Sequence, residues 1–407
     1  MHKYLIRFDE ICLKGGNRRY FEDILVKNIK ASANTLGKNR IEFLRDRIYV
    51  EFDLSISCKD IEALLMKIAG ICDFSKITTC ESDLDKIYQV AKTLTSDLSG
   101  TFKVEAKRNY KKFPQKSPEI ARLVGSAVYI EDKLTVDLSN PEHKLYVHVY
   151  KEETLLYCKK TQGPGGLPVG SSGRLLSLVS GGIDSPVASW NMFQRGCRVV
   201  FAHFHNHHDE EKDVRDKVMT LVKTLSSYQP YTRLYMIPFG ELQRAIIGFV
   251  PSKMRMVSYR RMMFRIASII RHKEKCKGYI TGDSVGQVAS QTLDNLRAIH
   301  DVADYPVISP LIGQNKNEVM ANARKIGTYD TSIIPYDDCC SFLLDPHPEQ
   351  AIDLHEIREI EAQIPMVDVI RPCIENTKVI AFEMGKLVYE KNAGIKIPQG
   401  FEDRLRP

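Results

Sequence analysis

The chain has 407 residues, of which 43% are apolar and 27% are charged, and its formal net charge is +7. This length exceeds the ~100–200 residues of a typical domain, so we expect two or three domains with substantial cores. The apolar runs are shorter than the ~18 residues that a membrane-spanning helix needs, and the N-terminus turns acidic too early for a signal peptide. We therefore expect a cytoplasmic protein without a membrane segment.

The ten cysteines are too few and too scattered for a dense disulfide framework. None of them lies in the C-x-x-C spacing of a zinc or thioredoxin-like site. We expect reduced thiols, most of them acting as small core residues.

The N-terminal residues predict a small β-α-β-β unit. Residues 3–8 alternate like a strand, residues 20–33 have helical spacing, and residues 40–44 and 47–52 read as two short strands. This order predicts a ferredoxin-like module over residues 1–56.

A second α+β module is expected over residues 57–162. Its predicted helices are 59–70, 84–97 and 117–128, and its predicted strands are 101–107, 135–138, 144–150 and 155–159. The last two strands form a hairpin.

This second module contains a basic segment between Phe102 and Arg122, with seven basic residues, two acidic ones and three interleaved aromatics. Cations suit RNA phosphates, and aromatic rings suit unstacked bases. A solvated basic face without RNA is the alternative. The candidate RNA-binding residues are Lys103, Lys107, Arg108, Lys111, Lys112, Lys116 and Arg122.

A linker is expected at residues 163–173, because five glycines and two prolines there exclude a helix or an interior strand. Beyond it, short apolar strands alternate with helical segments over residues 174–407. That alternation predicts an α/β domain with a doubly wound parallel sheet. Ligands bind such sheets at the carboxyl ends of the strands.

The strand-length run Leu175–Val179 ends at Ser180–Ser185, with the sequence Ser-Gly-Gly-Ile-Asp-Ser, and a helical segment follows. Adjacent glycines let backbone N–H groups converge on an anion, and the helix dipole adds positive charge. Neither G-x-x-x-x-G-K-[ST] nor G-x-G-x-x-G is present. The segment resembles the PP-loop of ATP pyrophosphatases, with an ordinary turn as the alternative. Phosphate binding is expected at Ser180, Gly181, Gly182 and Ser185.

The histidine-rich tract at residues 203–209, at the end of the next predicted strand, has two possible interpretations. His203 and Phe204 are expected to border a bound adenine. Alternate histidines and an aspartate in the tract 203–209 are also what a zinc or manganese hydrolase would use. No second His/Asp cluster completes such a site, so we predict no metal site.

Two further segments point to nucleotide or RNA. Arg260 and Arg261 lie on a predicted helix and suit phosphate, although a plain basic face is the alternative. Residues 281–292, Thr-Gly-Asp-Ser-Val-Gly-Gln-Val-Ala-Ser-Gln-Thr, allow close backbone approach to a base or ribose. A strand-end turn without a ligand is the alternative there.

Six segments in series resemble the tRNA 4-thiouridine synthetase family: Gly-Gly-Leu-Pro-Val-Gly, Ser-Gly-Gly-Ile-Asp-Ser, Tyr-Arg-Arg-Met-Met, the 281–292 segment, Ser-Pro-Leu-Ile-Gly with Lys316, and Asp-Asp-Cys-Cys. The second module likewise resembles a THUMP domain. The family adenylates O4 of the uridine at tRNA position eight, releases pyrophosphate, and then replaces AMP with persulfide sulfur. The resemblance implies ATP with Mg²⁺ as counter-ion, tRNA as partner, and a homodimer.

The resemblance also assigns residues. Asp184 and Lys316 match aids to adenylation, and Cys340 or its neighbour Cys339 matches the thiol that delivers sulfur. From the residues alone, two structural thiols are the alternative, because the flanking acids raise a thiol pKa. The family's ATP contacts carry over to Leu178, Val179, His203, Phe204, Arg260, Gly282 and Gln291.

The chain departs from longer family members in two ways. It ends at Pro407 without the rhodanese domain of those members, and Met256–Tyr259 lacks the C-x-x-C ligands of others. We therefore expect sulfur from a separate cysteine desulfurase, a stand-alone rhodanese or sulfide, with Cys373 as a candidate resolving thiol. The alternatives are another PP-loop RNA-modifying enzyme, such as a different thiolase or a lysidine-type ligase, a non-catalytic THUMP RNA-binding protein, and a metal-dependent hydrolase.

Overall fold

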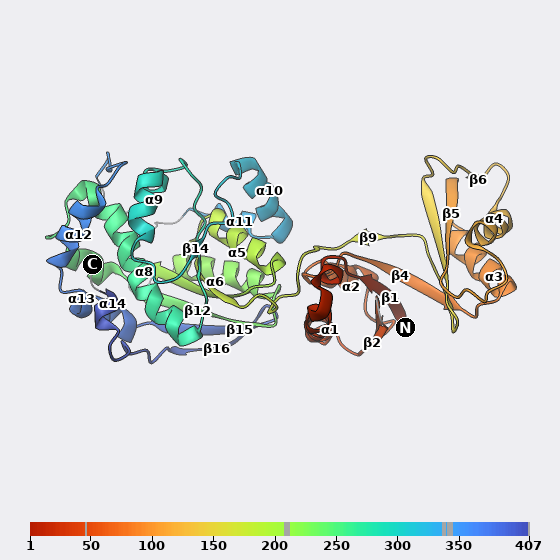
Figure 1. Cartoon of the computed structure of the whole chain (residues 1–407), viewed down its shortest axis with the longest axis horizontal. Coiled ribbons are helices and arrows are strands. Elements are labelled where there is room, and N and C mark those ends of the chain that lie inside the picture. Colours follow the sequence, from red (N-terminus) through yellow and green to blue (C-terminus); the bar gives the residue numbers. More distant parts are fainter. Residues whose placement is uncertain (45–46, 207–211, 336–338, 340–344, 406–407) are drawn as a thin grey trace. The chain divides into compact units, whose positions relative to one another are not determined.

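The computed structural model describes residues 1–44, 47–206, 212–335, 339 and 345–405. The chain divides into two compact units (Figure 1). Met1–Glu22 and Ser32–Gly165 form the first unit, and Asp23–Ala31 and Gly166–Pro407 form the second. Within the described ranges, every helix is too short or too polar to cross a bilayer.

The first unit is built on a nine-stranded sheet of order β2-β3-β1-β4-β8-β7-β5-β6, with β9 beside β4. The N-terminal elements of the chain follow the predicted β-α-β-β order. They are β1 (His2–Arg7), the 3₁₀ helix η1 (Glu10–Asn17), α1 (Arg18–Ala33), β2 (Asn39–Leu44) and β3 (Arg47–Phe52).

Two elements extend this first part beyond residue 56, where the expected module ended. They are α2 (Cys58–Leu65) and β4 (Asp73–Cys80). The first half of β4 pairs antiparallel with β1, and its last three residues pair with β8 (Thr154–Tyr157). β4 was missing from the predicted strands, because its sequence is largely polar although its first half is buried. It links the two modules through one continuous sheet.

The second module packs two helices on one face of its strands. A buried cluster joins α3 and α4 to β5 through residues such as Ile87, Phe102 and Ile120. The elements are α3 (Leu84–Thr95), β5 (Gly100–Arg108), α4 (Ser117–Val128), β6 (Leu134–Val136), β7 (His143–Val149), β8 and β9 (Thr161–Gln162).

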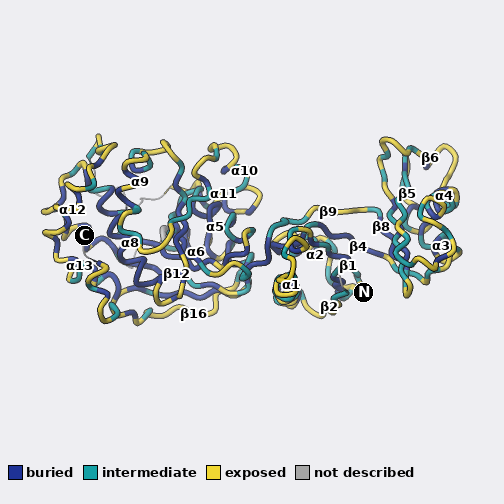
Figure 2. The backbone as a smooth tube through the Cα atoms, in the orientation of Figure 1, coloured by how far each residue is buried: buried dark blue, intermediate teal, exposed yellow. Residues whose placement is uncertain are grey.

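The second unit is a seven-stranded sheet of order β14-β13-β10-β11-β12-β15-β16. Strands β14 to β12 are parallel, as predicted, whereas β15 and β16 add an antiparallel edge that was not predicted. In Figure 2 the inner strands are dark blue and β16 is largely yellow, in agreement with its exposed residues. The strands are β10 (Arg174–Leu178), β11 (Arg198–His205), β12 (Tyr231–Pro238), β13 (Tyr279–Ile280), β14 (Val307–Ile308), β15 (Lys378–Glu383) and β16 (Lys386–Asn392).

Helices cover this sheet and connect its parallel strands. They are α5 (Asp184–Gln194), α6 (Lys212–Ser226), α7 (Gly240–Ile246), α8 (Arg255–Glu274), α9 (Leu293–His300), α10 (Lys316–Ile326), α11 (Tyr329–Ser332), α12 (Leu354–Ala362), α13 (Met366–Glu375) and α14 (Glu402–Leu405), with the 3₁₀ turns η2 (Ser252–Met254) and η3 (Ala289–Gln291). The chain runs from β10 outward to β12, then returns to β13 on the other side of β10. The strand order therefore reverses beside β10, where doubly wound folds bind their ligands.

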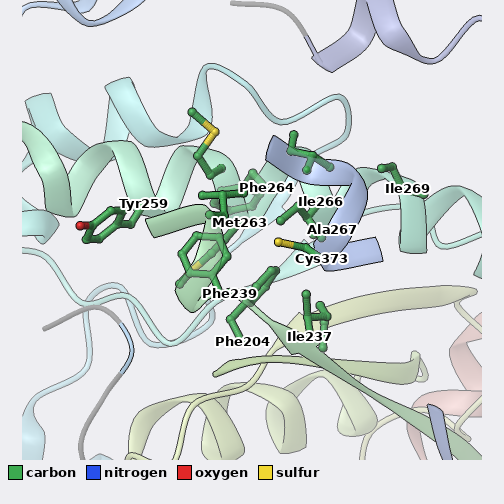
Figure 3. Close-up of a cluster of buried hydrophobic side chains, with 14 of the residues drawn as sticks. Phe204, Ile237, Phe239, Tyr259, Met263, Phe264, Ile266, Ala267, Ile269 and Cys373 are labelled. Carbon is green, nitrogen blue, oxygen red and sulfur yellow. The ribbon is translucent and has the colours of Figure 1, made fainter. Parts of the chain in front are cut away.

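The core of this unit lies between the sheet and α8. Figure 3 shows Phe204 and Phe239 among its buried side chains, with Tyr259, Met263 and Phe264 from α8. The rings of Phe204 and Phe239 meet edge to face with centroids 5.4 Å apart. Because α8 is buried along most of its length, its packing fixes the positions of the residues on its first turns.

Candidate active site

The segment Ser180–Ser185 forms a closed turn between β10 and α5. The Ser185 hydroxyl accepts a hydrogen bond from the Ser180 N–H at 2.9 Å, and the Gly182 N–H lies 3.3 Å from the Ser180 hydroxyl oxygen. Helix α5 begins at Asp184 without a side-chain cap, because Ile183 stands at the N-cap position. The positive end of the helix dipole is therefore directed at the turn, an arrangement that favours phosphate.

The predicted catalytic pair Asp184 and Lys316 is brought together by the fold. Lys316 Nζ lies 2.6 Å from Asp184 Oδ1 and 2.9 Å from Oδ2, although 132 residues separate them. Gln287 adds a third hydrogen bond, from Nε2 to Asp184 Oδ2 at 3.1 Å. The lysine is the first residue of α10, so two helix starts meet here.

Gly282 packs directly against the start of α5. A Cβ atom at this position would lie 2.7 Å from the Ser185 nitrogen and 3.0 Å from the Asp184 carbonyl carbon. The absence of a side chain at Gly282 therefore lets the strand end after β13 approach the turn of Ser180–Ser185.

Leu178, Val179, His203 and Phe204 lie at the carboxyl ends of β10 and β11. The ring Nδ1 of His203 lies 2.9 Å from the Val179 carbonyl oxygen, and the Val179 N–H bonds to Ala202 O at 2.9 Å. Phe204 points into the core shown in Figure 3, so only its backbone can border a nucleotide.

Arg260 and Gln291 are held by one carboxylate that the sequence analysis did not select. Arg260 Nη2 lies 2.8 Å from both oxygens of Asp283, and Gln291 Nε2 lies 3.2 Å from Oδ1. Burial raises the pKa of Asp283, but the charge of Arg260 and the hydrogen bonds to the carboxylate outweigh it and hold that pKa well below its usual range. Asp283 is therefore ionised at neutral pH.

Asp283 and Gln287 are the residues missed by sequence reasoning. Both lie in the 281–292 segment, which was selected as a whole for its small residues and amides. Their individual roles depend on which side chains face Arg260 and Asp184, and those positions are set by segments far away in the chain.

Arg261 does not clamp phosphate or RNA. Its side chain is fully buried, and it donates to both oxygens of Glu361 on α12 at 2.9 and 2.8 Å. Arg265 joins the same carboxylate at 2.7 Å. These two arginines and Glu361 therefore connect α8 to α12. Removing one partner would leave a buried charge uncompensated, which costs roughly 3–5 kcal/mol.

The candidate thiols lie in different surroundings. Cys340 lies outside the described residues. Cys339 is 7% exposed within the core, and its carbonyl oxygen accepts a hydrogen bond from Gln243 at 2.7 Å. Cys373 is also buried, and burial together with the nearby charge of Glu241 raises the pKa of its thiol to about 12. Both thiols are therefore buried, whereas a reactive thiol is exposed, and the raised pKa of Cys373 also disfavours its thiolate.

Within the histidine tract, His203 contacts the Val179 carbonyl oxygen at the end of β10, and its ring stacks on that of His205. Its residues 207–209 lie outside the described residues. In the part of the chain that the structure describes, no group of three His, Cys, Asp or Glu side chains could hold a metal ion.

The basic segment lies on β5, α4 and the loop between them. Lys103 and Arg108 bond to the backbone at Leu138 O (3.2 Å) and Phe113 O (3.1 Å), respectively. The other five candidates are exposed: Lys107, Lys111, Lys112, Lys116 and Arg122.

The aromatic residues of that segment do not form a base-stacking surface. Phe102 and Phe113 are buried in the core of the module, and Tyr110 packs against the same cluster. Their spacing reflects the inward face of β5 and the packing of the following loop. The segment therefore offers cations but no free rings.

Three protein-family models together match most of the chain. A family model described as Thiamine biosynthesis protein (ThiI) matches residues 170–366. A ThiI ferredoxin-like domain model matches residues 3–75, and a THUMP domain model matches residues 81–159. The predicted ferredoxin-like, THUMP and PP-loop architecture is confirmed.

Proteins that are similar over nearly the whole chain point to the same family. A probable tRNA sulfurtransferase of Acetivibrio thermocellus is 40% identical over 383 residues, which cover 92% of this chain and 97% of that protein. The corresponding protein of Moorella thermoacetica is 38% identical over 384 residues, covering 93% and 97%. A crystal structure described as a 4-thiouridine synthetase–RNA complex with bound ATP matches with a TM-score of 0.87 at 33% identity, covering 94% of this chain and all of that one. The chain therefore belongs to the tRNA sulfurtransferase family.

Proposed function

We propose that this protein uses ATP to transfer sulfur to tRNA, converting the uridine at position eight to 4-thiouridine. The observation that carries the proposal is the Asp184–Lys316 pair at the start of α5, next to a turn suited to phosphate. The relatives named tRNA sulfurtransferase and the ATP-bound 4-thiouridine synthetase structure support it.

ATP enters as its magnesium complex and binds at the carboxyl edge of the sheet. Its phosphates lie at Ser180–Ser185, where the backbone and the helix dipole attract them. Arg260 provides a further cation for the phosphates. The adenosine lies between the ends of β10 and β11, beside Leu178, Val179, His203 and the backbone of Phe204, with Gly282 and Gln291 on the opposite side.

The first chemical step is adenylation of the uracil. Uridine O4 attacks the α-phosphorus, a new O–P bond forms, the bond to the β-phosphate oxygen breaks, and pyrophosphate leaves while the uracil N3 proton passes to water. Lys316 stabilises the charge that develops on the phosphates, and Asp184 positions Lys316. Asp184 would also hold a magnesium ion that enters with ATP, and this ion would supply further positive charge for the phosphates. A poor leaving group, O4, thereby becomes AMP.

The second step delivers sulfur. The terminal sulfur of a persulfide on Cys340 attacks C4, and the C4–O bond breaks to release AMP. A second thiol then attacks the remaining sulfur–sulfur bond, which leaves 4-thiouridine and a disulfide that an external thiol reduces. Because Cys339 and Cys373 are buried, we propose Cys340 as the acting thiol. A separate desulfurase or a stand-alone rhodanese supplies the persulfide sulfur. Sulfide does not form a persulfide without an oxidant, so it would attack C4 directly and release AMP.

tRNA binds through the THUMP module. The exposed cations of the basic segment contact the phosphates of the tRNA. The module then recognises the shape of the tRNA and does not stack its bases on aromatic rings. We further propose a cytoplasmic homodimer, in which the RNA-binding module of one subunit presents tRNA to the catalytic unit of the other.

The test incubates the full-length protein with tRNA, MgATP and sulfide. The proposal expects AMP, pyrophosphate and the near-ultraviolet absorbance of 4-thiouridine in equal amounts. ADP with phosphate would instead indicate a different ATP chemistry, and RNA binding without nucleotide turnover would indicate a non-catalytic THUMP protein. Activity that is lost with a zinc chelator in the presence of excess Mg²⁺ would favour the metal-dependent hydrolase.

A further inference from the structure

One buried carboxylate organises two of the proposed nucleotide contacts. Asp283 is 3% exposed and follows Gly282 at the strand end. Its oxygens accept Arg260 Nη2 at 2.8 Å and Gln291 Nε2 at 3.2 Å. Arg260 of α8 and Gln291 of η3 therefore both bind the buried carboxylate of Asp283.

The carboxylate fixes which end of the Gln291 amide faces the site. An ionised carboxylate only accepts hydrogen bonds, so the amide must turn its NH₂ group toward Asp283. The other end, Gln291 Oε1, is buried and has no hydrogen-bond partner among the described residues. A buried acceptor without a donor is unfavourable, and a bound ligand that donates there would relieve that cost.

We propose that Asp283 is a positioning residue that makes Gln291 an acceptor for an N–H or O–H donor of the bound nucleotide. The proposal rests on the proposed function, because it takes the nucleotide to lie beside Gln291. ATP offers two such donors, the exocyclic amine of adenine and the ribose hydroxyls. A purine with an oxygen in place of that amine would present an acceptor to an acceptor.

Arg260 is oriented by the same carboxylate. One of its terminal nitrogens bonds to Asp283 and the other lies 3.4 Å from the Ser290 carbonyl oxygen. These bonds leave other donors of the guanidinium for a phosphate. Its side chain is only 15% exposed, so the orientation that Asp283 sets is the one the ligand meets.

The test is a binding experiment on the full-length protein with Mg²⁺ and without tRNA. Dissociation constants are measured for ATP, inosine triphosphate, 2′-deoxy-ATP and 3′-deoxy-ATP. In the wild type, the analogue that lacks the donor should bind about tenfold more weakly than ATP. Inosine triphosphate identifies the adenine amine, and the deoxy analogues identify a ribose hydroxyl.

Asp283→Asn should abolish this discrimination. An asparagine can donate to Gln291 Oε1, so the amide of Gln291 is free to turn. The dissociation constant of the weakly bound analogue should then be within about threefold of that of ATP, which brings the ratio of the two constants close to unity. Gln291→Ala should lose the same preference, and the double variant should show no further loss. The ratio does not depend on the fraction of folded protein, so a destabilised variant still reports.

The matched control is Asp304→Asn, which removes a carboxylate that pairs with Arg271 at 2.7 Å. It should keep the wild-type ratio. The inference is overturned if the wild type binds all four nucleotides equally, or if Asp283→Asn keeps the wild-type ratio. Preferential ATP binding without 4-thiouridine formation would contradict the proposed function and leave this inference standing.

Discussion

Lys316 Nζ bridges both carboxylate oxygens of Asp184, at 2.6 and 2.9 Å, and so joins the first residue of α10 to the first residue of α5. Both side chains are partly exposed, at 42% and 22%. A pair this exposed contributes roughly 0–1 kcal/mol to stability. From its position beside the turn of Ser180–Ser185, we propose that the pair acts in the chemistry rather than in folding.

Removing either member should therefore affect rate far more than folding. Lys316→Ala and Asp184→Asn should each lower the rate of tRNA-dependent pyrophosphate release about 100-fold or more, since both act on the charge that develops in adenylation. Midpoints of thermal unfolding should stay within a few degrees of the wild type. Wild-type pyrophosphate release by either variant would exclude the pair from adenylation.

Gly282→Ala should weaken ATP binding. The added Cβ would lie 2.7 Å from the Ser185 nitrogen, so either the segment after β13 or the turn of Ser180–Ser185 must move. We expect the Kd for ATP to rise about tenfold, which corresponds to roughly 1.4 kcal/mol. Gly313→Ala is the control, because a Cβ there meets no atom within 4 Å. Equal Kd values for the two variants would show that the close approach at Gly282 is unimportant.

The cysteines should separate the two chemical steps. Cys340→Ala should still release pyrophosphate but form no 4-thiouridine with a persulfide donor, because only sulfur delivery needs the thiolate. Cys373→Ala should retain both steps, since burial raises the pKa of that thiol to about 12. Mass spectrometry of the tRNA after a single turnover measures the product. Loss of thiolation in Cys373→Ala at normal stability would instead assign Cys373 as the resolving thiol.

The THUMP module should lose stability as pH falls below 6.5. Burial, followed by nearby cations such as Arg7 and Lys107, lowers the pKa of His148 from 6.5 to about 4. Between these values the unfolded state binds a proton that the folded state does not. The free energy of unfolding therefore decreases with falling pH, by at most about 1.4 kcal/mol per unit, and is unaffected by this group above pH 6.5.

Amide hydrogen exchange in β7 between pH 7 and pH 5 measures this effect after correction for the intrinsic exchange rate. The comparison is His148→Gln, which cannot bind a proton and should show a flatter pH dependence of the opening free energy. Identical pH dependence in both proteins would refute the assignment to His148.

The basic segment should contribute to tRNA affinity through phosphates. Replacing Lys111 and Lys112 by alanine should lower the slope of log K against log salt by about 1–2, because each neutralised phosphate contributes about 0.7–0.9. The control pair is Lys86→Ala with Lys92→Ala, which removes two exposed cations of α3 outside the segment. If both pairs change the slope alike, the effect is one of net charge and the basic segment is not the RNA site.

The local patterns predicted most of the fold. Hydrophobic periodicity placed α4 at the residues where the structure has it, and it located the parallel strands β10, β11, β12 and β13 but not β14. It failed at β4 and β15, because β4 is largely polar in sequence and β15 is an antiparallel strand that follows a series of helices. Their partners β1 and β12 lie about 70 and about 150 residues earlier in the chain.

The site was predictable in part. The glycine turn and the family resemblance selected Asp184 and Lys316, which the structure brings into contact. The sequence could not separate Arg260 from Arg261, since both lie on one helix and only the three-dimensional packing turns the first toward Asp283 and the second toward Glu361. Burial, likewise, distinguishes Phe102 and Phe113 from stacking residues only once the sheet is formed.

In the proposed adenylation, uridine O4 becomes part of AMP, and an isotope label can follow this oxygen. tRNA carrying ¹⁸O at O4 of the uridine at position eight is incubated with the protein, MgATP and sulfide, and AMP is analysed by mass spectrometry. Adenylation at O4 should give one ¹⁸O atom in each AMP and one 4-thiouridine for each AMP released. Unlabelled AMP, or ADP in its place, would contradict it.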